Sequence, residues 1–444
     1  MRPHSKRIIV FFAVGTMTWL PLSLVTILAM SLSLGAASVE AQQSAPVVRI
    51  DLDQAIYLAL QHNHALQAAR TTIQQSEAQE VTANLRPNPV LAGDYNFVPL
   101  LSPSYFGVPV SQVPLPQEED ASVAYTLELG RKREARLAAA RDQSAVTRST
   151  IADDERNLTF QVASQFIDAL LAESTLDFAQ QDLKSFQNTV DLSAERYKAG
   201  DISQGDDLKI QLQLLQFQTD VSTAQLAMIQ SLAGLRQLLG FESVPDQFDI
   251  AGQLDYQPVY TGLDNLKALA LRSRPDLRAA QQSIAGAQSQ YHLARADAKP
   301  DLIPQLGYSH AGDEHTLDFG FSIALPIFNR NQGEVARTRY AIVQSQELAR
   351  GNSQQVLTDV VDAYATLHIS GQIVQFYRGG YLDQAKFSRD ITEYAYRHGA
   401  ASLLEFLDAE RTYRANQLAY RQALATYMTA LEQTRQAVGT RSLP

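Results

Sequence analysis

The fold is decided by a stretch that occurs twice in the chain. The first copy is Tyr197-Lys198-Ala199-Gly200-Asp201-Ile202-Ser203, and the second is Tyr396-Arg397-His398-Gly399-Ala400-Ala401-Ser402. The copies lie 199 residues apart, and the spacing holds without a gap as far as Gly240 and Gly439. Glycine adopts the left-handed conformation that ends a helix, and serine caps the N-terminus of the next one. Each copy therefore predicts a tight helical hairpin, turning at Gly200 and Ser203 or at Gly399 and Ser402.

Long helices are predicted on both sides of each turn, over 131–198, 203–240, 330–398 and 402–438. The first of these contains no proline and no internal glycine. Its apolar residues recur at alternating spacings of three and four, which indicates the seam of an antiparallel coiled coil. They are Leu176, Ala179, Leu183, Phe186 and Val190. At ~1.5 Å per residue this helix is on the order of 100 Å long, more than a compact globule needs.

A pair of short strands is predicted before each long helix. The pairs cover 90–98 with 121–129, and 301–309 with 316–325. Strands of about nine residues have the length that crosses an outer membrane when tilted. Four strands do not close a barrel, and an open sheet edge is not tolerated in lipid. We therefore expect the chain to oligomerise, with a trimer supplying the strands of a twelve-stranded β-barrel.

The repeat divides the chain into a first structural repeat over 42–245, a linker over 246–262 and a second structural repeat over 263–444. Residues 1–41 read as a signal peptide, with a basic start, a long apolar run and small residues before a cleavage site after Ala41. A retained membrane anchor is the alternative interpretation. No later segment is apolar enough for a transmembrane helix, so a membrane span would be built from strands.

Composition narrows the functional classes. The 444 residues include no cysteine, which excludes a disulfide scaffold and thiolate metal sites. The formal net charge of −10, a single tryptophan and the lack of long basic runs argue against nucleic acid as a partner. We find no Ser–His–Asp order and no phosphate loop, so no enzyme, cofactor or metal site is predicted. The segment His310–His315 combines imidazoles and carboxylates, but a polar surface loop is the favoured interpretation.

These features together resemble the TolC-type outer-membrane efflux channels. The features are the two tip turns, the strand pairs that follow Pro87 and Pro300, and the twofold repeat. The resemblance implies a mainly α fold with a small β part, in which three chains form a β-barrel and a periplasmic α-barrel. It also implies an outer-membrane location reaching into the periplasm, where the tips dock an adaptor (membrane fusion protein) joined to an inner-membrane pump. Two motifs, Glu128–Arg133 and Pro326–Glu334, are similar to the heavy-metal cation-efflux subclass.

Basic residues gather where strands pass into long helices. Arg131, Lys132 and Arg133 lie at one such joint and Arg330 at the other. The helix macrodipole disfavours cations at an N-terminus, so another charge must offset it. We expect lipid headgroup phosphates to do so, with a solvated basic turn as the alternative.

The second tip carries the candidate periplasmic gate. Glu405 and Asp408 follow Gly399 by six and nine residues, the positions at which the family places acidic residues facing the tunnel. Being three apart, they share one helix face. Their alternative role is that of solvated carboxylates at a helix N-terminus. By the same resemblance, Asp206 accepts a hydrogen bond from Tyr396 and locks the hairpins. Ala401 replaces the family's basic residue, so a weaker lock is expected.

The predicted function is a passive efflux conduit, with heavy-metal cations as the first candidate cargo and drugs or small organic molecules as the second. A soluble periplasmic coiled-coil scaffold is the alternative from another class, although a scaffold has no need of the strands. The sequence leaves open the cargo, the partner pump and whether the segment Pro99–Asp120 folds inward as a lid or stays a surface loop.

Overall fold

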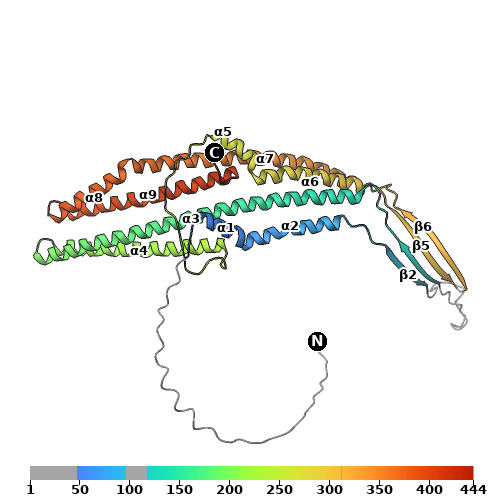
Figure 1. Ribbon diagram of the computed structural model, residues 1–444, viewed down its shortest axis with the longest axis horizontal. Coiled ribbons are helices and arrows are strands. Elements are labelled where there is room, and N and C mark those ends of the chain that lie inside the picture. Colours follow the sequence, from blue (N-terminus) through green and yellow to red (C-terminus); the bar gives the residue numbers. More distant parts are fainter. Residues whose placement is uncertain (1–47, 97–117, 312, 444) are drawn as a thin grey trace, which may run out of the picture. The chain divides into compact units, whose positions relative to one another are not determined.

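The computed structural model describes residues 48–96, 118–311 and 313–443 (Figure 1). The predicted signal peptide and most of the predicted loop Pro99–Asp120 lie outside the described residues. The described part is mainly helical with a small sheet, which confirms the predicted fold class. Within it, no helix combines the length and the apolar character needed to cross a membrane.

Helix α3 (Lys132–Ala199) is 68 residues long and carries the packing of the first half. Figure 1 shows α2 (His64–Ala83), α4 (Gln204–Leu239) and α6 (Pro275–Asp297) running beside it. Helix α1 (Leu52–His62) also packs on α3. The buried face of α3 supplies Val162, Phe166 and Leu170 to a cluster with Leu235 and Leu239 of α4. The core therefore lies in stripes between helices, as the spacing of apolar residues predicts.

The second half is built around α7 (Gln332–Phe376), which packs on α6, on α5 (Leu263–Ser273) and on α9 (Leu403–Val438). Helices α4 and α9 each span 36 residues, and their limits differ by the repeat spacing of 199. The buried residues of this half include Val356, Val360 and Ala363 of α7, against Ala437 and Val438 of α9.

The predicted continuous helix over 330–398 is wrong in one respect. A π-helical segment, η3 (Tyr377–Tyr381), separates α7 from α8 (Leu382–Arg397). Gly380 has a φ of 113°, which breaks the regular helix. Glycine costs about 1 kcal/mol in a helix interior, and kinks gather at such positions. The adjacent Gly379 and Gly380 have no counterpart in α3, which explains why only the second long helix breaks.

The four longer strands form one antiparallel sheet in the order β2-β3-β5-β6. They are β2 (Val90–Asn96), β3 (Glu118–Ala124), β5 (Leu302–Ala311) and β6 (Glu314–Ile323). The predicted strand over 121–129 is displaced, because β3 starts with the acidic residues 118–120 and ends at Ala124. Beyond its end, the Tyr125 amide donates to the Pro304 carbonyl, and Leu127 forms an isolated bridge with Leu302. Alternating apolar residues gave the strand but not its register, which pairing with β2 and β5 decides.

The predicted linker over 246–262 also takes part in the core. Its β4 (Phe248–Ile250) pairs in parallel with β1 (Val48–Ile50), and Ile50 and Ile250 are both buried. Further along, Tyr256 packs on Tyr427 with ring centroids 4.6 Å apart. The segment is rich in Pro, Gly and Asp, a composition typical of exposed linkers, so its packing in the core was not predicted from the sequence.

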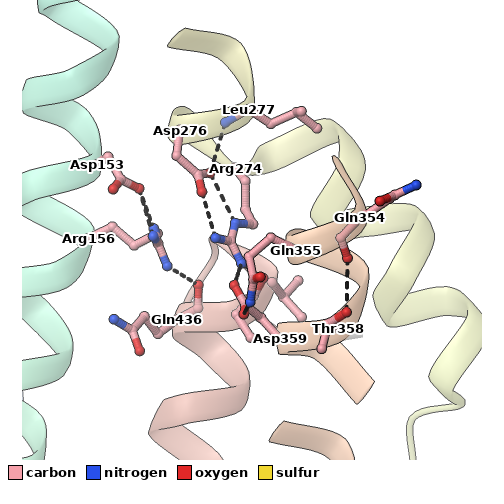
Figure 2. A network of polar contacts seen from close by, with 12 residues as sticks. Asp153, Arg156, Arg274, Asp276, Leu277, Gln354, Gln355, Thr358, Asp359 and Gln436 are labelled. Carbon is pink, nitrogen blue, oxygen red and sulfur yellow. Dashed lines mark hydrogen bonds and ion pairs between the residues drawn. The ribbon is translucent and has the colours of Figure 1, made fainter. Parts of the chain in front are cut away.

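A polar junction ties α5 and α6 to α7 and α9 (Figure 2). Arg274, whose side chain is 5% exposed, pairs with Asp276 at 2.6 Å and with Asp359 at 2.8 Å. It also donates to the Ala437 carbonyl at the end of α9. Burial by itself raises the pKa of Asp276, but the hydrogen bonds and charge of Arg274 outweigh burial and lower it. A buried guanidinium is thus matched on each side by a hydrogen-bonded carboxylate.

We predict that Arg274→Ala lowers the free energy of unfolding by about 2–3 kcal/mol, since it strands two carboxylates that are each partly screened by water. The apparent unfolding temperature of the purified protein measures this. Because the folded pKa of Asp276 is lowered, its stabilisation is present at neutral pH and lost as the pH falls through that pKa. Arg337→Ala, which removes an exposed pair with Glu334, is the control. Equal effects of the two variants would contradict the prediction.

Candidate functional site

The two helical tips are built alike. Gly200 and Gly399 have φ values of 83° and 74°, and Ser203 and Ser402 cap α4 and α9. A Cβ atom at either glycine would meet nothing within 4 Å, so backbone conformation rather than space requires the glycine. The tip hairpins therefore form at the residues whose local chemistry favours them.

An apolar cluster joins the two hairpins just below the tips. Phe186 of α3 stacks on Phe217 of α4, with centroids 4.3 Å apart, and Tyr396 stacks on Phe406 of α9 at 5.3 Å. Phe186 and Phe406 also lie parallel, 6.5 Å apart, which links the first hairpin to the second. Stacked aromatic pairs of this kind add to the energy of burial. The buried members are Phe186, Val190, Ile210, Phe217, Tyr396, Leu403 and Phe406.

The predicted lock between Asp206 and Tyr396 is replaced by other contacts. Asp206 accepts hydrogen bonds from Ser203 at 2.9 Å and Lys209 at 3.3 Å. Both partners belong to α4 or its N-cap, because Asp206 lies three residues after the capping serine. The Asp206 carboxylate is therefore bound within its own hairpin. The hydrogen bond from Ser203 is the largest of the effects that lower the pKa of Asp206.

Two residues of α3 that the sequence analysis missed hold Tyr396 instead. Arg196 donates to the Tyr396 carbonyl at 2.9 Å, and the Ser193 hydroxyl lies 3.4 Å from the Tyr396 phenol. The Arg196 guanidinium also lies 5.3 Å from the centre of the Tyr396 ring. Tyr396 is 4% exposed. Tyr396 is thus held by α3 rather than by α4, which no local pattern in the sequence signals.

The two candidate gate carboxylates both lie on the exposed surface of α9. Glu405 completes a capping box with Ser402, accepting from its amide and its hydroxyl at 2.7 Å each. These hydrogen bonds lower the pKa of Glu405, with the amide bond leading. Glu405 is therefore anionic at neutral pH and has a structural role as well. Asp408 lies three residues further along the same face.

The two tips differ in charge. At the first tip, the residues at the same offsets are Asp206 and Lys209, which pair with each other at 3.3 Å. At the second tip both offsets carry carboxylates, and neither Glu405 nor Asp408 has a cationic partner in the described residues. At these two offsets, unpaired negative charge is therefore exposed at the second tip but not at the first.

The predicted basic cluster is divided by the structure. Lys132 is 8% exposed and pairs at 2.8 Å with Asp301, so it is not available to lipid headgroups as predicted. Arg131 has an 85% exposed side chain and pairs with Glu134, and Arg133 is half-buried. At the other joint, the exposed Arg330 donates to the Pro326 carbonyl. An exposed arginine thus remains at each joint, while Lys132 is structural.

The backbone at both joints is left-handed. Gly130, Arg131 and Asn331 have positive φ values of 79°, 62° and 57°. Asp301 accepts from the Leu129 amide as well as pairing with Lys132, so it fixes the end of one repeat's strand pair to the start of the other's. Left-handed non-glycine residues are uncommon and persist where surrounding contacts hold them. The joints are therefore rigid connections between the strands and the helices.

Comparison with known proteins decides what this architecture is. Residues 55–241 and 266–440 match the family described as outer membrane efflux protein. The chain belongs to this family. The cobalt-zinc-cadmium resistance protein CzcC of Cupriavidus metallidurans is 24% identical over 396 residues, covering 88% of each chain. The pyoverdine export outer membrane protein OpmQ of Pseudomonas putida is 24% identical over 82% of this chain and 80% of its own.

Solved structures of outer-membrane proteins share the fold. A CusC structure superposes with a TM-score of 0.73 at 20% identity, covering 89% of this chain and 93% of that chain. VceC from Vibrio cholerae gives 0.71 at 18% identity, covering 88% and 96%. The predicted TolC-type efflux protein in the outer membrane, reaching into the periplasm, is confirmed. Its family and fold are those of outer-membrane channels rather than of enzymes.

For this efflux protein, we predict that Lys132→Ala destabilises the strand–helix joint, because it leaves the Asp301 carboxylate without its buried cationic partner. Increased cleavage near the joint by added protease, measured on the purified protein, reports the change. Arg131→Ala is the matched control, since that neighbouring side chain is exposed and pairs only within its own helix. Equal cleavage of the two variants would show that the Lys132 contact is dispensable.

Proposed function

We propose that this protein is the outer-membrane conduit of a tripartite efflux system, passively conducting heavy-metal cations from an inner-membrane pump and a periplasmic adaptor. The observation that carries the proposal is the exposed acidic pair at the second tip. Like charges brought close together either repel or take up cations. The names of relatives support the cargo, since CzcC is a cobalt-zinc-cadmium resistance protein and CusC of Escherichia coli K12 is a cation efflux system protein.

A homotrimer accounts for the two sheet edges that a single chain leaves unpaired. Strands β2 and β6 form the two edges of the four-stranded sheet, and Phe319 and Phe321 of β6 are 79% and 74% exposed. Pairing these edges between three copies closes one sheet of twelve strands without an open edge. Migration of the detergent extract as a heat-sensitive trimer supports this arrangement, whereas a protein recovered with the soluble periplasmic contents contradicts it.

Helices α4 and α8 also carry exposed apolar side chains that a second copy of the chain would cover. Leu208, Leu212 and Leu215 of α4 are 50%, 70% and 60% exposed, and Phe387 and Tyr394 of α8 are 68% and 66% exposed. Large apolar side chains in rows mark surfaces that another helix covers. In the trimer, α4 of one copy and α8 of the next would cover one another and close the periplasmic α-barrel. The soluble scaffold loses support, because the family resides in the outer membrane.

In the trimer, Glu405 and Asp408 of the three copies would form two stacked rings at the tunnel entrance and act as its gate. We expect Glu405→Ala/Asp408→Ala to lower the preference for cations and relieve blockade by multivalent cations, because the ring charge is removed. Single-channel recordings in planar bilayers measure both properties. Asp383→Ala, which removes an exposed carboxylate of α8, is the control. Unchanged selectivity and blockade in the double variant would exclude these residues as the gate.

The cargo is tested in cells. Deleting the gene should reduce tolerance to zinc, cobalt and copper, and the wild-type gene should restore it, because cations lose their route across the outer membrane. Growth at graded metal concentrations measures the effect, with several antibiotics as the comparison. The alternative cargo, drugs or small organic molecules, is favoured by the likeness to the pyoverdine exporter OpmQ. Antibiotic hypersensitivity with unchanged metal tolerance would reverse the order of the two candidates.

A further inference from the structure

Two buried carboxyl groups meet between the hairpins, away from the exposed gate residues. Asp182 of α3 and Glu410 of α9 are each 6% exposed. Arg414, which contacts Asp182, lies one turn along α9 from Glu410, and this places the two carboxyl groups at the same contact between α3 and α9. Within the described residues, the buried Asp182 Oδ2 atom accepts no well-aligned hydrogen bond. Two carboxyl groups at one buried contact are satisfied together when one of them carries a proton.

Two arginines flank the pair. Arg414 of α9 lies 2.6 Å from Asp182 through its Nε atom and also pairs with Asp220 of α4. Its guanidinium lies 4.1 Å from the centre of the buried Phe217 ring. Arg389 of α8 approaches Glu410 at 3.9 Å and lies 4.6 Å from the centre of the Tyr413 ring. Groups from α3, α4, α8 and α9 thus meet in one cluster.

The charges in this cluster do not balance without a proton. Its carboxyl groups outnumber its guanidinium groups, because Arg389 is shared among Glu410, Asp390 and Glu393, at 3.9, 3.1 and 3.4 Å, and Arg397 pairs with Glu393 alone. Burial, and then the charge of Asp182, raises the pKa of Glu410 to about 7. Burial likewise raises the pKa of Asp182, against the opposing charge of Arg414. The charged and titratable groups facing the pair are Asp220, Arg389, Asp390, Glu393, Tyr413, Arg414 and Arg421.

We propose that Asp182 and Glu410 form a proton-binding site that couples the first hairpin to the second. With the proton bound, Glu410 donates to Asp182 and joins α9 to α3. Without it, two buried carboxylates face each other and repel. Since the folded pKa of Glu410 is raised, the stabilisation is full below its ordinary range and is lost as the pH rises through about 7.

The position of this proton-binding site links it to the tips. The cluster is on the same helices as the aromatic contacts that join the tips, so losing the proton loosens the hairpins that carry the gate. Only this consequence for conduction rests on the proposed function. The coupling of the hairpins is a property of the chain and is measured separately.

The test uses the lack of cysteine in the natural chain. Cysteines replacing the exposed Gln218 of α4 and Lys386 of α8 carry spin labels, and labelled chains are diluted with unlabelled ones so that each pair lies within one chain. We expect the distance between the labels to lengthen and broaden as the pH rises, with a midpoint near about 7. In Glu410→Gln, which cannot ionise, the short distance should persist throughout.

Two further variants decide between explanations. Asp182→Asn removes the neighbouring charge, so the midpoint should move to lower pH. Glu432→Gln is the control, because Glu432 is 5% exposed on the same helix, pairs with Arg435 and lies far from the tip. A wild-type distance that does not change with pH, or a transition that survives unchanged in Glu410→Gln, overturns the proposal. So does its equal loss in Glu432→Gln.

Planar-bilayer recordings separate the two proposals. If the distance changes with pH while conductance does not, the proton site stands and its link to the gate is rejected. If both change in wild type and neither changes in Glu410→Gln, the site regulates the conduit.

Discussion

The lateral burial of α3 is the constraint on which the rest of the structure depends. A helix of 68 residues has no globular core around it, so each stretch of it is stabilised only by the helix that lies beside it. Its buried residues accordingly fall into separate clusters. One lies with α1 and α4 around Phe166, and another lies near the tips around Phe186. Because the clusters are separate, the tips can loosen while the remainder of the helix stays packed.

The hairpins are joined near the tips by two kinds of contact, one apolar and one ionisable. Stacked rings of Phe186, Phe217 and Phe406 join the hairpins by apolar contact, which carries no charge and does not respond to pH. The neighbouring cluster around Asp182 and Glu410 joins the same hairpins through ionisable groups, where burial makes protonation decisive. The exposed carboxylates of the second tip lie outside both. A surface that attracts cations and an interior contact that binds a proton are thus carried by one helix, α9.

The opposite end of the helices is fixed by a different device. The left-handed Arg131 and Asn331 turn each chain segment from strand to helix, and the contact of Lys132 with Asp301 crosses between the repeats. The sheet and the helices are therefore connected by geometry that depends on both halves. Each repeat thus supplies a partner to the other at this joint.

The sequence by itself determined the elements whose cause is local. Glycine followed by serine ends one helix and caps the next, so the tip turns and the equal lengths of α4 and α9 follow from a few neighbouring residues. The candidate gate carboxylates Glu405 and Asp408 were predicted from spacing and resemblance, and both lie on the exposed surface of α9. The break at Gly380 also has a local cause, although a continuous helix was predicted there.

Only the tertiary structure decided which distant residues meet. Tyr396 is held by Ser193 and Arg196 rather than by Asp206, and Lys132 is buried against Asp301 rather than exposed. The pairing of Asp182 with Glu410 belongs to the same class. A helical pattern gives the face on which a side chain lies but not the rotation of the opposite helix, and that rotation is set by the packing of all the stripes together. Partners across the repeats therefore became visible only once the helices were in place.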